Sequence, residues 1–448
     1  MRQKGLKTGR AAEKMAFLSG RGEPQGHEGE TGVAVTLTGN ACIGQSGGPS
    51  AVINQSLVGV IEEARRHKKE IKSLLGAVHG TKGIMGEKFI ELLGIPQSKL
   101  EKIAATPGAA LGSVRHKPKD EDCAAMLEIF KKRDIRYFFY IGGDDSAKAA
   151  HIIQGMARKS GYEMVVVHVP KTIDNNLMES DHTPGFGSAA RFVANAVRGD
   201  ELDNRSLPGV KVDIIMGRNA GWLAAASMLA RVDKGDGPHL IYLPEVPFTP
   251  EKFLGDVKRV YAEHKRAVVC VSEGIRDPEG KLWAETAGKH LYEGLKDDAR
   301  NLLGKPKKDA FGHFQLSGTG VLADFLTGLI SNNTDISRVR GDTFGYLQRS
   351  FPGFESKIDQ REARQVGRAA VKWACQGRVG SVAIKRRPSK AYKSYLGLVD
   401  LSLVAGLNRE VSKEFICPGG NDICPSFRDY CLPLVGGLPE TAIFENLE

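Results

Sequence analysis

Short apolar runs alternate with helical patterns along most of this chain. The runs rich in β-branched and aromatic residues, which we expect to form buried strands, are Ala41–Gln45, Lys72–Val78, Tyr137–Ile141, Met164–Val169, Val212–Met216, His239–Leu243 and Ala267–Val271. Between them, segments with the length and periodicity of covering helices lie at 51–66, 119–133, 145–158, 186–203, 219–231 and 250–264. Strands that alternate with helices are typical of βαβ units, so the sequence predicts an α/β fold with parallel sheets in two doubly wound lobes.

Two segments depart from this alternation. Residues 1–38 are rich in Gly, Lys, Arg and Glu and carry little periodic apolar pattern, which predicts a disordered N-terminal tail. Residues 276–336 are polar, with repeated Gly, Lys and Asp, so we expect an insertion in the second lobe there. Further along, Ser356 followed by Asp359 and Glu362 indicates the start of a helix.

The composition narrows the class of protein without deciding its function. The formal net charge of +10 suits an anionic ligand, and neither an RNA-binding aromatic motif nor a zinc-finger spacing suggests nucleic acid. No apolar stretch of about 18 residues occurs and the N-terminus lacks the apolar core of a secretory signal, so we expect a cytoplasmic protein that binds no membrane. The seven cysteines are thinly spread, and we expect reduced thiols. The alternative, a metal site at Cys417, Cys424 and Cys431, lacks a familiar spacing and a nearby histidine.

Three loops rich in glycine or polar residues follow predicted strands and lead into predicted helices or loops. They cover residues 44–50 (GQSGGPS), 141–146 (IGGDDS) and 170–176 (PKTIDNN). In open α/β sheets, ligands bind beyond the carboxyl ends of the strands, where free N–H groups point outward. We therefore expect the chemistry of the protein to lie in these loops.

The residue types in these loops suit phosphoryl transfer. Asp144 offers oxygen ligands for a Mg²⁺ ion shared with phosphate. Lys171, Thr172 and Asp174 supply a cation and a hydroxyl donor for phosphate and a base for a hydroxyl proton. A single loop of this kind is often only a turn or a helix cap, but three of them at strand ends favour a common function. The chain contains no GxxxxGK[ST] motif and no HRD or DFG set, so neither a P-loop enzyme nor a protein kinase fits.

An ordered series of motifs extends this pattern over about residues 40 to 360. It comprises Gly47–Gly48, Leu111–Arg115 (LGSVR), Gly142–Ser146 (GGDDS), Pro170–Asn175 (PKTIDN), Met216–Arg218 (MGR), Ser272–Gly274 (SEG) and Arg340 through Gly345–Arg349 (GYLQR). The series resembles the phosphofructokinase family, which has these motifs in the same order. The resemblance implies two Rossmann-like lobes with an active-site cleft between them. It places a phosphoryl-donor lobe at 39–185, completed by about 355–448, and a sugar-phosphate lobe at 186–354.

The resemblance also implies a role for each matching residue. Asp174 would accept the proton of the sugar 1-hydroxyl, Thr172 would contact the phosphoryl group and Arg218 would neutralise its charge. Asp144 would organise Mg²⁺, the expected cofactor. The other implied site residues are Met216, Gly217 and Glu273 for the sugar, Arg340, Tyr346 and Arg349 for its 6-phosphate, and Gly47, Gly48, Arg115, Gly143 and Asp145 for the donor. In the family the counterpart of Arg340 reaches in from a neighbouring subunit, so the resemblance implies a homo-oligomer, at least a dimer.

Asp145 and Lys171 decide the expected phosphoryl donor. ATP-dependent relatives carry glycine at both positions, which leaves room for the nucleotide. Two like charges 4 Å apart repel by about 4 kcal/mol at an effective dielectric constant of 20, so Asp145 opposes the α-phosphate of ATP. Lys171 suits the leaving phosphate of pyrophosphate and can also pair with Asp145. The combination resembles the pyrophosphate-dependent branch, which implies reversible transfer to the 1-hydroxyl of fructose 6-phosphate, giving fructose 1,6-bisphosphate and phosphate.

Two residues depart from the family pattern, and two other functions stay open. Asn176 stands where the family usually has an acid, and Lys211 lies near a position where many members have a cross-subunit arginine. The same chemistry could act on sedoheptulose 7-phosphate, because residues that bind the terminal phosphate and a base at the 1-hydroxyl do not by themselves select the length of the sugar. A catalytically silent regulatory subunit is the other alternative, against which the retained Asp144, Lys171 and Asp174 speak. The sequence leaves the oligomer size beyond a dimer and any effector site open.

Overall fold

The computed structural model describes residues 37–293 and 318–442. The expected disordered tail at 1–38 therefore lies almost entirely outside the described residues, as does the middle of the expected insertion at 276–336. None of the helices in the two described ranges combines the length and the apolar character that a membrane span needs.

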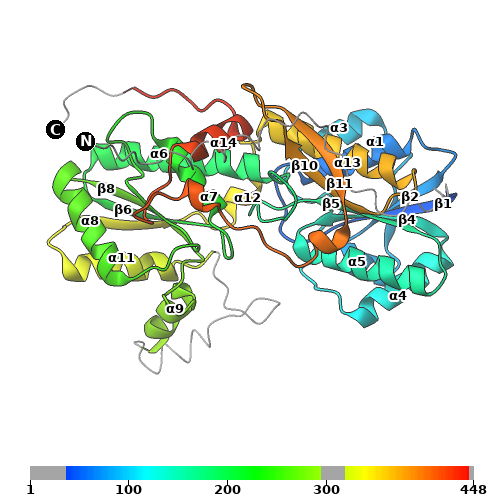
Figure 1. Ribbon diagram of the computed structural model, residues 1–448, viewed down its shortest axis with the longest axis horizontal. Helices are drawn as coiled ribbons and strands as arrows, with labels where there is room; N and C mark the ends of the chain where they lie inside the picture. Colours follow the sequence, from blue (N-terminus) through cyan, green and yellow to red (C-terminus); the bar gives the residue numbers. More distant parts are fainter. Residues whose placement is uncertain (1–36, 294–317, 443–448) are drawn as a thin grey trace, which may run out of the picture. The chain divides into compact units, whose positions relative to one another are not determined.

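The first lobe is built on a seven-stranded sheet with the order β11-β10-β5-β4-β1-β2-β3 (Figure 1). Its strands are β1 (Gly39–Gln45), β2 (Ile71–Ala77), β3 (Phe89–Glu91), β4 (Ile135–Gly142), β5 (Val165–Pro170), β10 (Gly380–Arg386) and β11 (Ser394–Val399). The five inner strands are parallel, and β3 and β11 are antiparallel strands at the two edges. The predicted strands of this lobe are confirmed, and the parallel order brings the carboxyl ends of β1, β4 and β5 to one edge.

Two layers of helices cover this sheet (Figure 1). One layer contains α1 (Ile53–Ala64), α3 (Gln97–Ala104) and α13 (Lys357–Ala374), and the other contains α2 (Gly80–Met85), α4 (Asp120–Lys132) and α5 (Asp144–Lys159). Successive residues of β1 face opposite layers, since Ile43 packs in the α1 layer and Cys42 in the α4 layer. Ser356 caps α13 as predicted, because its hydroxyl accepts a hydrogen bond from the backbone N–H of Asp359.

The second lobe is built on a four-stranded parallel sheet with the order β7-β8-β6-β9. Its strands are β6 (Val210–Ile215), β7 (Leu240–Tyr242), β8 (Ala267–Ser272) and β9 (Val339–Thr343). One face packs against α6 (Phe186–Ser206), α7 (Trp222–Ala226), η1 (Ser227–Ala230) and α14 (Ser426–Val435), and the other against α8 (Pro250–His264) and α11 (Val321–Asn333). The remaining short elements are α9 (Trp283–Glu293), α12 (Leu347–Ser350), η2 (Leu401–Leu403) and η3 (Lys413–Phe415).

The helix α11 corrects the expectation that 276–336 is an insertion. Its Leu322, Leu326 and Ile330 are buried in the same cluster as the apolar residues of β6 and β8. These three residues repeat every four positions, which places them on one face of a helix. Because these residues are buried, α11 belongs to the core of the second lobe. The polar average composition of the segment concealed this apolar stripe in the sequence.

Candidate active site

A cavity of about 290 Å³ lies at the carboxyl ends of strands from both lobes. It is lined by Ser46, Gly47, Gly48, Pro49, Val114, Arg115, His116, Lys117, Pro118, Tyr140, Gly143, Asp144, Asp145, Ser146, Lys171, Thr172, Ile173, Asp174, Met216, Arg218, Asn219, Glu273 and Arg349. All three loops singled out in the sequence contribute to this wall, since β1, β4 and β5 are neighbours in one parallel sheet. The residues expected at the donor, the metal and the transferred group therefore share one cavity.

Glycines in the first loop make room for polar groups of other segments. Gly47 has a positive φ of 73°, which favours glycine, and its N–H donates to the Val114 carbonyl oxygen at 3.1 Å. A Cβ on Gly48 would lie only 2.5 Å from Nη1 of Arg349. A side chain at position 48 would thus displace the Arg349 guanidinium from the cavity wall.

The second loop places two carboxylates at the start of α5. Asp144 and Asp145 occupy its first turn, after Gly143 at the N-cap position. Burial and the neighbouring Asp145 raise the pKa of Asp144 above its usual range. The carboxylate of Asp144 lines the cavity and is a hard oxygen ligand, so this position fits Mg²⁺.

Asp145 pairs with Lys117, which the sequence did not suggest. Their side chains form an ion pair of 2.6 Å at the cavity, and both are partly exposed. The expectation that Lys171 pairs with Asp145 is wrong, because Lys117 takes this place. Lys117 lies two residues beyond the LGSVR motif in a segment without regular secondary structure, where only its charge could have marked it.

Lys171 is a buried cation that faces the cavity. Its side chain is 3% exposed, and Nζ donates to the Gly48 carbonyl oxygen at 2.7 Å. Burial lowers the pKa of Lys171 to about 8, and the neighbouring Arg349 and Arg115 act in the same direction, while Asp174 opposes them. The ammonium therefore lies close to its titration point at neutral to slightly alkaline pH.

Asp174 is the carboxylate at the centre of this group of cations. Burial raises its pKa, and the positive charges of Lys171, Arg349 and Arg115 counteract that effect. Its backbone N–H donates to the Thr172 hydroxyl at 3.1 Å, which fixes the turn between the two residues. A partly desolvated carboxylate of raised basicity can accept a proton from a substrate hydroxyl.

Segments far along the chain hold the loop that carries Asp174. Asn175 has a positive φ of 54°, and its side chain donates to the Tyr430 hydroxyl at 2.8 Å. The guanidinium of Arg409 donates to the Asn175 carbonyl oxygen at 2.9 Å. Asn176 is buried, does not line the cavity and donates to the Asn408 side chain. The departure of Asn176 from the family pattern thus lies behind the cavity wall.

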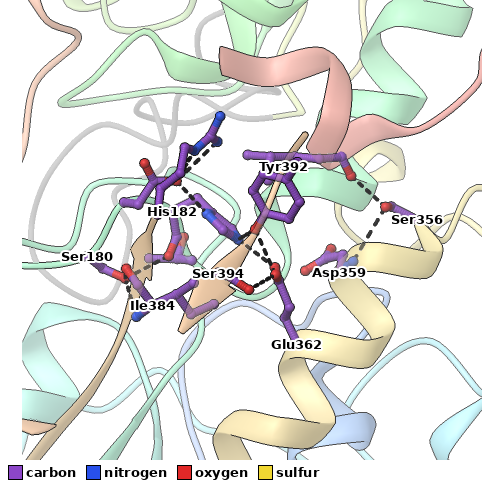
Figure 2. A network of polar contacts seen from close by, with 12 residues as sticks. Ser180, His182, Ser356, Asp359, Glu362, Ile384, Tyr392 and Ser394 are labelled. Carbon is purple, nitrogen blue, oxygen red and sulfur yellow. Dashed lines mark hydrogen bonds and ion pairs between the residues drawn. The ribbon is translucent and has the colours of Figure 1, made fainter. Parts of the chain in front are cut away.

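A buried histidine holds the end of the same loop. Figure 2 shows His182 beside Glu362, which also receives hydrogen bonds from Tyr392 at 2.7 Å and Ser394 at 2.5 Å. The ring of His182 donates to Asp181 at 2.8 Å and to Glu362 at 2.7 Å. Burial alone would lower the pKa of His182, but the two carboxylates outweigh it and raise the pKa. His182 is therefore a structural cation between two acids.

We expect His182→Gln to lower the free energy of unfolding by about 3 to 5 kcal/mol, because it leaves Glu362 buried without its cation. Urea denaturation at pH 6 measures the difference. Tyr392→Phe is the matched control, which removes one hydrogen bond to Glu362 and should cost about 1 kcal/mol.

The dependence of this loss on pH has a defined sign. Since the pKa of His182 is raised on folding, its contribution is complete below the unfolded pKa and is lost as the pH rises through the folded pKa. The difference between wild type and His182→Gln should therefore shrink at high pH. A difference that grows from pH 6 to pH 9 would contradict a charged His182.

The second lobe supplies the opposite wall of the cavity. Met216 and Arg218 follow β6 and Glu273 follows β8. Gly217, between Met216 and Arg218, has a φ of 146°, and a Cβ at this position would lie 2.5 Å from the Ala220 carbonyl oxygen. The backbone N–H of Met216 donates to Oε1 of the buried Gln348 at 3.2 Å. Gln348 belongs to the GYLQR motif, for which the resemblance implies no role at this position, and it supports this wall of the cavity.

Two of the expected 6-phosphate residues lie outside the cavity of this single chain. Arg340 is exposed on β9, and Tyr346 lies under the Arg349 guanidinium at 4.5 Å from its ring centre. Lys211, considered as a second cross-subunit contact, is buried and pairs with Asp200 and Asp203 of its own chain. Of the expected phosphate grip, only Arg349 lines the cavity here.

The chain matches one family of known proteins over most of its length. A family model described as Phosphofructokinase matches residues 40–374. A Rhodospirillum rubrum protein named pyrophosphate–fructose 6-phosphate 1-phosphotransferase is 46% identical over 404 residues, which cover 90% of this chain and 96% of the relative. A protein of the same name from Halomonas elongata is 35% identical over 420 residues, covering 91% and 94%. The crystal structure of a pyrophosphate-dependent phosphofructokinase from Marinobacter aquaeolei matches with a TM-score of 0.76 at 32% identity, covering 91% of this chain and 94% of that chain.

Proposed function

Because the chain belongs to the phosphofructokinase family, we propose that it transfers a phosphoryl group reversibly from pyrophosphate to the 1-hydroxyl of fructose 6-phosphate. The observation that carries this proposal is that Lys171 and the Asp145–Lys117 ion pair line the cavity, with Lys171 and Asp145 at the two positions where ATP-dependent relatives carry glycine. The relatives from Rhodospirillum rubrum and Halomonas elongata bear the name of this activity.

Four polar residues of the cavity have a part in the proposed reaction. Asp174 takes the proton of the 1-hydroxyl as that oxygen attacks the near phosphorus of pyrophosphate. The bond from this phosphorus to the bridging oxygen breaks, and Lys171 stabilises the charge on the departing phosphate. Arg218 faces the phosphoryl group in transfer. Mg²⁺, which Asp144 would hold, supplies further charge neutralisation on the phosphates.

The Lys117 contact changes the reason why ATP is excluded. An unpaired Asp145 would repel the α-phosphate of ATP, but the ammonium of Lys117 at 2.6 Å cancels most of that charge. The volume that the two side chains occupy at the cavity wall remains, and the resemblance to ATP-dependent relatives, which carry glycine at position 145, implies that a nucleotide would need this room. The bulk of the Asp145 and Lys117 side chains therefore excludes ATP more than the charge of Asp145 does. Pyrophosphate has no nucleoside, so neither effect excludes it.

A donor assay tests the proposed function directly. Purified full-length protein receives fructose 6-phosphate and Mg²⁺ with either pyrophosphate or ATP, and fructose 1,6-bisphosphate is measured. We expect turnover with pyrophosphate and little with ATP. Robust turnover with ATP and none with pyrophosphate would overturn the donor assignment, and turnover with neither would revive the silent regulatory subunit. A comparison of kcat/KM for fructose 6-phosphate and sedoheptulose 7-phosphate decides the sugar.

The proposal includes a cytoplasmic setting and a homo-oligomer in which Arg340 serves the cavity of a neighbouring subunit. Its exposure on β9, away from its own cavity, supports this arrangement. We expect Arg340→Ala and Asp174→Ala each to be nearly inactive alone. Mixed dimers formed after dissociation and reassociation should regain about a quarter of wild-type activity, because half of the dimers are mixed and each of these has one complete site. No recovery, with mixed dimers shown by tagged chains, would place Arg340 in its own subunit's site.

A further inference from the structure

Three aspartates meet in the second lobe, outside the cavity. Asp200 comes from α6, Asp213 from β6 and Asp342 from β9, and one carboxylate oxygen of each lies within 4.8 Å of the other two. Asp213 and Asp342 are partners in the β6–β9 pairing, so their side chains leave the sheet on the same face. None of the three lines the cavity described above.

Asp213 is a buried acid without a hydrogen-bond donor or an ion-paired cation among the described residues. Its side chain is fully buried, and among the described residues no N–H or O–H group donates to either carboxylate oxygen, whose polar neighbour is the carboxyl group of Asp200. Oδ2 of Asp200 is likewise without a partner, although its other oxygen pairs with Lys211. A buried carboxylate without a donor or a counter-ion costs several kcal/mol, so it requires a proton or a cation.

The basic side chains nearby are engaged with groups other than Asp213. Lys211 pairs with Asp200 and, at 2.5 Å, with Asp203, and Arg338 pairs with Asp203 at 3.3 Å. The Arg340 guanidinium donates to the Val339 carbonyl oxygen at 2.8 Å. Among the described residues, none of these three cations forms an ion pair with Asp213. Burial and the carboxylates of Asp200 and Asp342 consequently hold the pKa of Asp213 well above its usual range.

We propose that Asp200, Asp213 and Asp342 bind a divalent cation of about the size of Ca²⁺, separate from the ion expected at Asp144. Carboxylate oxygens are the ligands that hard cations prefer. Ca²⁺ holds oxygens at about 2.3 to 2.6 Å, so opposite ligands lie up to about 5 Å apart, whereas Mg²⁺ needs them within about 4.2 Å. The three oxygens lie within 4.8 Å of one another, which is inside the range that Ca²⁺ accepts. Asp342 is exposed and gives the ion access from solvent.

The test is Ca²⁺ binding by the metal-stripped full-length protein without pyrophosphate, which would itself bind the ion. Isothermal titration and thermal unfolding should show a saturable site whose occupation raises Tm. Asp342→Asn, a change at an exposed position, should weaken Ca²⁺ binding at least about tenfold. Asp213→Asn should abolish the Tm response and should make the Ca²⁺-free protein more stable than wild type, because the amide needs neither a proton nor a counter-ion in its buried position.

The control separates this site from the cavity. Asp144→Asn removes the carboxylate expected to hold Mg²⁺ and should keep the Ca²⁺ response. Absence of saturable binding to wild type would overturn the proposal and mean that a proton or a partner's cation neutralises Asp213. Unchanged Ca²⁺ affinity in Asp342→Asn would also overturn it, and this variant decides the matter even if Asp213→Asn does not fold. The inference does not depend on the proposed reaction.

Discussion

Replacement of Asp174 by asparagine should lower kcat by roughly 10² to 10⁴, the usual effect of removing a general base. The amide keeps the size and the hydrogen-bonding shape of the carboxylate but cannot accept the proton of the 1-hydroxyl. Since Asp174 acts on the reacting oxygen and is surrounded by Lys171, Arg349 and Arg115, the KM for fructose 6-phosphate should change much less than kcat. Steady-state rates with pyrophosphate at several sugar concentrations measure both constants.

The matched control for this variant is Glu179→Gln. Glu179 lies five residues further along the chain, pairs with Lys385 at 3.1 Å and does not line the cavity, so the same carboxylate-to-amide change there should leave kcat unaltered. The pH profile adds a second readout. Because burial raises the pKa of Asp174, wild-type kcat/KM should fall with acidity at a higher pH than an ordinary aspartate would give, and Asp174→Asn should lack this decline. A kcat close to wild type would remove Asp174 from the role of base.

The residues of the cavity were predictable where they are local in sequence. Asp144, Lys171 and Asp174 each follow an apolar strand, and a parallel sheet gathers such loops at one edge whatever the rest of the chain does. The periodicity of the strands therefore sufficed to place the donor loops together. The sheet order β5-β4-β1 makes these three strands neighbours, so their loops lie together as the periodicity predicts.

The supports of the cavity were not predictable, because they pair residues across long stretches of chain. In the sequence Glu362 only follows a helix start at Ser356, and the fold alone brings it to His182, 180 residues away. Lys117 carries no motif, so its pairing with Asp145 depends on the course of an irregular segment. The polar average around α11 concealed a buried helix in the same way, since the apolar stripe is sparse.

Lys171→Met should lower kcat/KM for pyrophosphate by about 10² to 10³, equivalent to about 3 to 4 kcal/mol, because it removes a buried cation facing an anionic donor. The methionine keeps the length and much of the volume of the side chain, so the loss reports charge and not an empty space. Its effect on the KM for fructose 6-phosphate should be small. Equal losses toward both substrates would mean that Lys171 supports the whole cavity instead of the donor.

The titration of Lys171 makes the same assignment testable by pH. With a pKa of about 8 in the free protein, the ammonium loses its proton as the pH rises, so wild-type kcat/KM for pyrophosphate should decline above about pH 8. Bound pyrophosphate favours the charged amine and raises its pKa, so kcat at saturation should stay level to a higher pH. In Lys171→Arg the guanidinium does not titrate in this range, and the decline should vanish, even if the rate is lower throughout. Both proteins use the same pyrophosphate, so ionisation of the donor itself cancels in the comparison. An identical decline in both would assign the titration to another group and leave Lys171 as a cation whose charge persists through the working range.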